Sequence, residues 1–235
     1  MAAKSISAPM TSLERALGGI FFALYLLVLP FAADPLFAGL SRLIGREIPD
    51  NVRNIIFYCT LFALTLIIFW QYLGHTTGSF FSSFWKTSGA VCAGLVVFYG
   101  LNELAYRLFD LFLPSMTNLN DVTISAQIHD APRSTAMIII FLAPFVEEVL
   151  FRGYVFGNLR TTNRTAAYIV SCLLFAFLHV WQFAVVHQNL SYFLLMLQYL
   201  IPGFALSWTY ERSGNLWGSI LLHAFVNALA VWSVL

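Results

Sequence analysis

The chain has 235 residues, of which 60% are hydrophobic, whereas Asp, Glu, Lys and Arg together make up only 10%. Soluble domains carry roughly 25% of these charged residues, so the composition indicates a membrane protein. The formal net charge is +1 and no run of Lys or Arg occurs, which excludes nucleic acid and an anionic lipid surface as main ligands.

Charge-free intervals identify the membrane spans, because a bilayer core roughly 30 Å thick needs about 20 mostly apolar residues in helical form. In the first half of the chain we expect spans at about residues 16–33, 54–73 and 88–113. The glycine-rich polar segment 74–79 is expected to break the helix after the second span. Residues 80–85 then form an aromatic interfacial piece.

A polar loop at residues 114–133 separates these spans from the second half of the chain. Span four starts near Ser134, and residues 165–210 contain no Asp, Glu, Lys or Arg over 46 positions. This interval is long enough for two spans joined near residues 187–189, and residues 213–235 make a seventh. The sequence therefore predicts an all-α, polytopic membrane protein with about seven transmembrane helices.

Lys and Arg fall unevenly on the two sides of the predicted membrane protein. Six lie on the side of the N-terminus and four on the other: Lys4, Arg15, Lys86, Arg160, Arg164 and Arg212 against Arg42, Arg46, Arg53 and Arg133. The positive-inside bias predicts a multi-pass protein of the cell membrane with a cytoplasmic N-terminus. We expect its polar site to open toward the same side.

Three of the predicted spans contain ionisable or amide side chains, which are expensive in a membrane and therefore functional candidates. Span four holds Glu147-Glu148-Val-Leu-Phe-Arg152, span five holds Phe175-Ala-Phe-Leu-His179, and span seven holds His223-Ala-Phe-Val-Asn227. Counted at 1.5 Å per residue, Glu147 and His179 lie roughly 20 Å deep, and His223 and Asn227 roughly 12 and 18 Å. We expect one polar catalytic layer between helices four, five and seven.

The spacing within span four assigns different roles to its two glutamates. Glu148 and Arg152 are four residues apart and share a helix face, so we expect them to form a structural ion pair. Glu147 has no cation at that spacing and is the freer base. Together with His179 it can deprotonate a water molecule.

His223 and Asn227 can present N–H donors to the oxyanion of a tetrahedral intermediate. The alternative is a zinc site with Glu147, His179 and His223 as ligands and a metal-bound water as nucleophile. The residues leave both mechanisms open, so no cofactor is obligatory and divalent zinc is an alternative.

The three motifs, in this order and each on a membrane helix, resemble the CPBP family of intramembrane proteases, also called the Abi or type II CAAX prenyl endopeptidase family. Its pattern is E-E-x-x-x-R, then F-x-x-x-H, then H-x-x-x-N/D, and the segment 213–217 before the last motif also resembles the family. The resemblance covers about residues 137–230. It divides the chain into N-terminal transmembrane helices with a loop, residues 1–133, and a CPBP-like catalytic core, residues 134–235.

The resemblance implies a helical endopeptidase that cleaves a peptide or membrane-protein substrate, prenylated in some members, within the lipid bilayer. It implies that Glu147 and His179 activate the water and that His223 and Asn227 stabilise the oxyanion. It also favours a glutamate-dependent mechanism without a bound metal.

Two other classes of function compete with the protease. One is a non-catalytic membrane scaffold or bacteriocin-immunity protein that keeps the polar cluster for packing. The other is a proton-coupled carrier, for which inverted repeats with Gly or Pro breaks in both halves are typical. Pro144 and Pro202-Gly203 interrupt spans in the second half, and we favour the protease.

Overall fold

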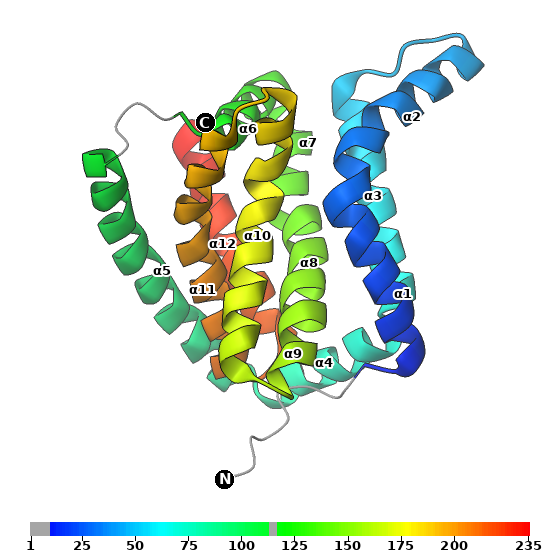
Figure 1. Ribbon diagram of the computed structural model, residues 1–235. Coiled ribbons are helices and arrows are strands. Elements are labelled where there is room, and N and C mark those ends of the chain that lie inside the picture. Colours follow the sequence, from blue (N-terminus) through cyan, green and yellow to red (C-terminus); the bar gives the residue numbers. More distant parts are fainter. Residues whose placement is uncertain (1–9, 113–116) are drawn as a thin grey trace.

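The computed structural model describes residues 10–112 and 117–235, which form a helical bundle with no β-strand among them (Figure 1). Seven helices are long and apolar enough to cross a membrane: Ser12–Ile44, Asp50–Ile68, Phe84–Leu108, Pro132–Arg160, Arg164–Val186, Leu190–Ser213 and Leu216–Val234. The predicted all-α, polytopic membrane fold with about seven spans is confirmed.

The first half of the chain contributes the outer helices of the bundle. They are α1 (Ser12–Ala23), the π-helix η1 (Leu24–Val28), α2 (Leu29–Ile44), α3 (Asp50–Ile68), α4 (Trp70–Ser82) and α5 (Phe84–Phe112). The first span is longer than predicted because α1, η1 and α2 continue one another through Asp34 to Ile44. The predicted end of the third span, at residue 113, lies outside the described residues.

The predicted helix break at residues 74–79 is wrong. The chain bends earlier, at Phe69, and α4 then runs through this segment across the end of the bundle (Figure 1). Contacts with the last helix favour the helical form, because Thr76 Oγ1 accepts from the backbone amide of Leu216 at 3.0 Å and Thr77 Oγ1 from Trp217 Nε1 at 3.0 Å. Tertiary hydrogen bonds thus override the weak local propensity.

The second half forms the centre of the molecule. Its elements are α6 (Leu119–Asp130), α7 (Pro132–Met137), η2 (Ile138–Leu142), α8 (Ala143–Glu148), η3 (Val149–Phe156), α9 (Gly157–Arg160), α10 (Arg164–Val186), η4 (Leu190–Leu195), α11 (Met196–Ser213) and α12 (Leu216–Val234). The predicted polar loop therefore contains the helix α6.

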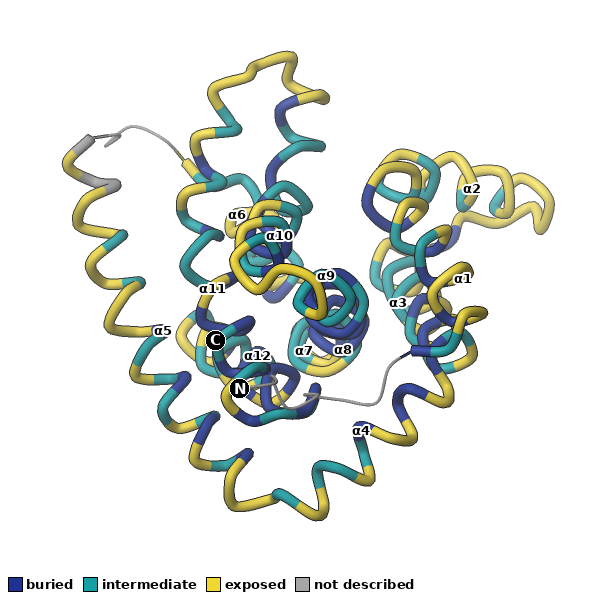
Figure 2. The backbone as a smooth tube through the Cα atoms, turned by 60° about the horizontal axis from the view of Figure 1, so that its bottom comes forward, coloured by how far each residue is buried: buried dark blue, intermediate teal, exposed yellow. Residues whose placement is uncertain are grey.

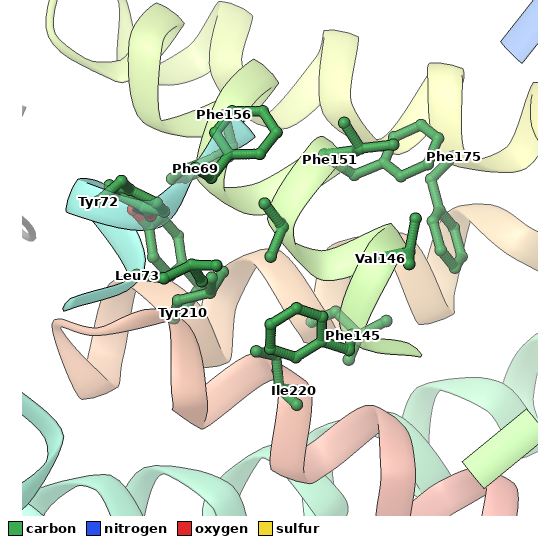
Figure 3. Close-up of a cluster of buried hydrophobic side chains, with 14 of the residues drawn as sticks. Phe69, Tyr72, Leu73, Phe145, Val146, Phe151, Phe156, Phe175, Tyr210 and Ile220 are labelled. Carbon is green, nitrogen blue, oxygen red and sulfur yellow. Dashed lines mark hydrogen bonds between the residues drawn. The ribbon is translucent and has the colours of Figure 1, made fainter. Parts of the chain in front are cut away.

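The fourth span, from α7 to α9, is the most enclosed element. In its most apolar window 56% of the residues are buried, against 11% to 33% in the other spans. Figure 2 shows the buried residues concentrated on α8, and Figure 3 shows Phe145 and Phe151 of this span packed in one aromatic cluster with residues of other helices, including Phe175 of α10. The motif glutamates thus lie on the central helix.

The fourth span changes its hydrogen-bond spacing before and after α8. In η2 the amide of Ala143 bonds to the carbonyl of Ile138, five residues earlier. The next donor in this register would be residue 144, which is Pro144 and has no N–H. The carbonyl of Ile139 instead accepts from Asn227 Nδ2 at 2.8 Å. Such π-turns are frequent at functional sites.

Candidate active site

The candidate site residues of three different spans face one cavity. Glu147 on α8, His179 on α10, and His223 and Asn227 on α12 line a cavity of about 1510 Å³. Glu147 and His223 are 8% and 9% exposed, so both groups lie in the interior of the bundle. The fold therefore brings together the four side chains that the motifs single out.

Glu148 lies behind this cavity in a fully buried polar network. Its Oε1 accepts from Arg152 Nη1 at 3.0 Å, and both side chains have no exposed surface, so the predicted ion pair is confirmed. Arg152 also donates from Nη2 to the carbonyl of Gly203 at 3.1 Å, and its guanidinium lies 4.3 Å from the ring centre of Phe175. The pair links α8 and η3 to α10 and α11.

The same carboxylate oxygen contacts the histidine of the third motif, a link that the sequence did not reveal. His223 Nδ1 lies 2.8 Å from Glu148 Oε1. Glu148 Oε1 already accepts from Arg152 and accepts here as well, so Nδ1 of His223 is the donor. The other ring nitrogen, Nε2, points toward Glu147, with 4.0 Å between Nε2 and Oε2. Glu148 therefore orients His223 as well as pairing with Arg152.

The tautomer of His179 follows from its hydrogen bond. Its Nδ1 lies 2.8 Å from the carbonyl oxygen of Phe175, which can only accept, so Nδ1 carries the proton. Nε2 of the neutral ring is then an unprotonated acceptor. The ring is held between Phe175 and Tyr199, with centroid distances of 4.6 and 4.4 Å.

Tyr199 is fixed in turn by Asn118, the N-cap residue of α6. Asn118 Nδ2 donates to the Tyr199 hydroxyl at 2.9 Å, and that hydroxyl donates back to Asn118 Oδ1 at 3.1 Å. The residues of α6 line the same cavity. Sequence reasoning missed Tyr199 because an aromatic residue in an apolar span has no distinguishing signal.

Two tyrosines of the N-terminal helices reach the same cavity. Tyr25 lies in the π-turn η1 and is 7% exposed, and its hydroxyl interacts with Glu147. Tyr58 on α3 lines the cavity next to it. Neither belongs to the three motifs, and only the π-turn, which cannot be read from the sequence, distinguishes Tyr25 from other aromatic residues.

The arrangement does not fit the zinc alternative. Among the described residues, no group of three His, Cys, Asp or Glu side chains is placed to hold a metal ion. A ligand set of Glu147, His179 and His223 would require these side chains to move.

The cavity opens on the side opposite to the one expected. Its lining continues from Glu147 to α6, to the start of α3 and to the last turns of α12, and no described residue of 148–174 contributes to it. The expected opening toward Arg160, Arg164 and Arg212 is therefore wrong. The count of Lys and Arg along the chain indicates an orientation in the membrane, but it does not indicate at which end of the bundle the cavity opens.

Comparisons with known proteins agree with the motifs. Residues 131–229 match the family model described as type II CAAX prenyl endopeptidase Rce1-like. The chain is 37% identical over 90 residues to the UPF0177 protein YxdF of Lactococcus lactis subsp. lactis (strain IL1403). It is 32% identical over 98 residues to the "Putative membrane peptidase YdiL" of Bacillus subtilis (strain 168).

These matches are partial. They cover 38% and 40% of this chain and 44% and 36% of the two relatives, so the chain matches less than half the length of either. No solved structure gives a significant match. The resemblance drawn from the motifs is nevertheless confirmed: residues 131–229 of this multi-pass membrane protein are similar to the type II CAAX prenyl endopeptidases, a family of membrane proteases.

Proposed function

We propose that this protein is an intramembrane endopeptidase that hydrolyses a peptide bond with a water molecule activated by Glu147 and His179. The observation that carries the proposal is that one cavity is lined by Glu147, His179, His223 and Asn227, with Nε2 of His179 left unprotonated. A carboxylate and a neutral imidazole are the side chains that general-base catalysis requires.

In the proposed reaction the water is held by Glu147 and His179 Nε2. Glu147 takes a proton from the water as its oxygen attacks the carbonyl carbon of the scissile bond. When the tetrahedral intermediate collapses, the C–N bond breaks and the proton passes to the leaving amine. Water and the peptide bond are thus converted into a carboxyl group and an amine.

The developing oxyanion requires hydrogen-bond donors. His223 donates from Nε2 when its ring is protonated, and the Glu148 carboxylate, 2.8 Å from Nδ1, stabilises that positive charge. Asn227 uses one N–H for the carbonyl of Ile139 and has a second N–H available. Glu148 and Arg152 act through His223 and do not touch the substrate.

The open end of the cavity supports entry of the substrate from the side of α6. We propose a peptide or membrane-protein segment that reaches Glu147 from that side, and residues 134–235 as the catalytic core. Residues 1–133 are then more than an anchor, because Tyr25 and Tyr58 line the cavity.

The test compares peptides released from cells that carry the wild-type protein, Glu147→Gln or His179→Ala. Loss of an activating group should lower cleavage by roughly 10²- to 10⁴-fold. The matched control is Glu103→Gln, a glutamate of α5 that is 62% exposed and paired with Arg107. Unchanged cleavage in Glu147→Gln, with normal protein levels, would favour the scaffold function instead.

We also propose a cytoplasmic N-terminus. Single cysteines at Thr162 and His187, both exposed and at opposite ends of α10, are placed in a variant without the native cysteines. A membrane-impermeant thiol reagent applied to intact cells should label position 187 only. Labelling of position 162 only would reverse the orientation.

A further inference from the structure

Four cationic side chains that are far apart in the sequence converge at the end of the bundle opposite to α6. Lys86 lies in the first turn of α5, Arg160 ends α9, Arg164 begins α10 and Arg212 lies in the last turn of α11. Together they line a pocket of about 850 Å³, with Gly89, Ala90, Ala93, Trp208 and Glu211. This basic pocket lies outside the cavity that contains Glu147.

The single carboxylate of the basic pocket is already engaged. Glu211 Oε1 accepts from Nε of Arg160 at 2.8 Å, and its Oε2 accepts from Arg164 Nη2 and from the Tyr168 hydroxyl, each at 2.7 Å. Four cations and one carboxylate leave the pocket with a formal charge of +3. Glu211 therefore organises the arginines without neutralising the pocket.

Lys86 and Arg212 supply the cations that remain available. Both side chains are exposed, and within the described part of the chain neither forms an ion pair. The Lys86 side chain reaches the end of α11: a Cβ atom added at Gly214, two residues after Arg212, would be 3.0 Å from the Lys86 ammonium. The pocket thus presents two cations without an ion pair, Lys86 and Arg212, together with the two arginines that hold Glu211.

The basic pocket lies at the level along the spans where lipid headgroups are expected. The third, fourth, fifth and sixth spans each begin or end beside it, so it lies at the boundary of the membrane. Trp85, next to Lys86, is 84% exposed, as is typical of an aromatic residue at the interface. On α5 the small residues Gly89 and Ala93 follow Lys86 into the membrane at helical spacing and line the pocket below the cations.

We propose that the basic pocket binds the phosphate of an anionic phospholipid headgroup. Arginine forks and a lysine ammonium are the groups that recognise phosphate oxygens, and an acyl chain can follow the small residues of α5. The composition argued against an anionic lipid surface as a main ligand, because it contains no run of Lys or Arg. The proposal departs from that expectation because the fold gathers cations from four separate positions of the sequence into one pocket.

The test measures the preference of the purified full-length protein for a fluorescent phosphatidylglycerol over the matching phosphatidylcholine in phosphatidylcholine nanodiscs. Each cation near a membrane surface contributes roughly fivefold to anionic-lipid binding. Lys86→Gln combined with Arg212→Gln should therefore lower the preference by roughly 25-fold. The matched control, Arg42→Gln with Arg46→Gln, removes two exposed cations from the opposite end and should leave the preference unchanged.

Two further measurements complete the experiment. One distinguishes a lipid headgroup from free phosphate, and the other separates loss of charge from misfolding. Inorganic phosphate should not displace the fluorescent lipid, whereas displacement at equal concentration would overturn the lipid assignment in favour of free phosphate. Lys86→Arg keeps the charge and should keep the preference, while Lys86→Gln alone should lose roughly fivefold. Equal binding of both lipids by the wild-type protein, or an equal loss in the control variant, would overturn the proposal. None of these measurements depends on protease activity.

Discussion

The second and fourth spans are both apolar enough to cross a membrane, yet they lie in different surroundings. In the fourth span 56% of the most apolar window is buried inside the bundle, whereas in the second span, α3, the share is 11%. Apolar residues of α3 mostly face the lipid. Those of the fourth span enclose a charged network formed by Glu148, Arg152 and His223.

The difference has a physical reason. Lipid tails are as apolar as leucine, so hydropathy reports that a helix is in the membrane but not which side faces protein. Polar groups decide the position: Glu148 and Arg152 have no exposed surface, so the helix that carries them is surrounded by others. The following predictions test this contrast, from the largest effect to the smallest.

The largest effect is expected from breaking the buried ion pair. Glu148→Gln or Arg152→Gln alone strands a buried charge and should destabilise the fold by about 3 to 5 kcal/mol. The double variant should recover folded protein, measured as the fraction that survives heating in detergent. Glu103→Gln, in the exposed pair with Arg107 on α5, should cost at most about 0.5 kcal/mol. Stable but inactive single variants would place the pair in the chemistry instead.

The next largest loss of stability is expected when a large apolar side chain of the fourth span, rather than one of the second span, is shortened to alanine. Phe151, with no exposed surface, packs edge-on against Phe22 and Phe175. Phe151→Ala should destabilise the protein by about 2 kcal/mol, because a cavity of roughly 100 Å³ remains in the bundle. Ile67→Ala in α3, where the side chain is 72% exposed, should change thermal stability by less than about 0.5 kcal/mol. Equal losses in both would show that α3 also packs against protein.

The sequence predicts the membrane spans and the motif residues, but not the hydrogen bonds that join these residues across helices. Charge-free intervals locate the seven spans but miss α4 and α6, and the E-E-x-x-x-R spacing predicts the Glu148–Arg152 pair. The contact between Glu148 and His223 joins residues 75 apart, and no local pattern encodes it. The bond from Asn227 to Ile139 joins residues 88 apart and depends on a π-turn before Pro144, neither of which a local pattern encodes.

A smaller effect is expected at Tyr199, whose ring stacks on His179 in the enclosed half of the molecule. Tyr199→Leu removes the stacking and should lower kcat about tenfold with little change in KM, since His179 is no longer held in place. Tyr199→Phe keeps the ring and loses only the interactions of the hydroxyl, such as those with Asn118, so it should retain most of the activity. In a His179→Ala background Tyr199→Leu should cause no further loss.

Tyr168→Phe is the control for this prediction. It removes one hydroxyl bond, to Glu211, at the other end of the helix that carries His179. Its cleavage rate should match that of the wild-type protein. If Tyr199→Leu lowers activity by the same factor with and without His179, Tyr199 acts on something other than this histidine.

The smallest effect tests whether the lipid-facing first half contributes to the chemistry at all. Tyr25, in the π-turn of the first span, directs its hydroxyl at Glu147 from outside the segment that matches the protease family. Tyr25→Phe keeps the buried ring and removes one hydrogen-bond donor to a carboxylate, which is worth about threefold in kcat if it orients Glu147. Tyr192→Phe, in η4 and outside the cavity lining, is the matched control and should have no effect. An unchanged kcat in Tyr25→Phe would confine the active site to residues 134–235, and the first three spans would then only support the central helix.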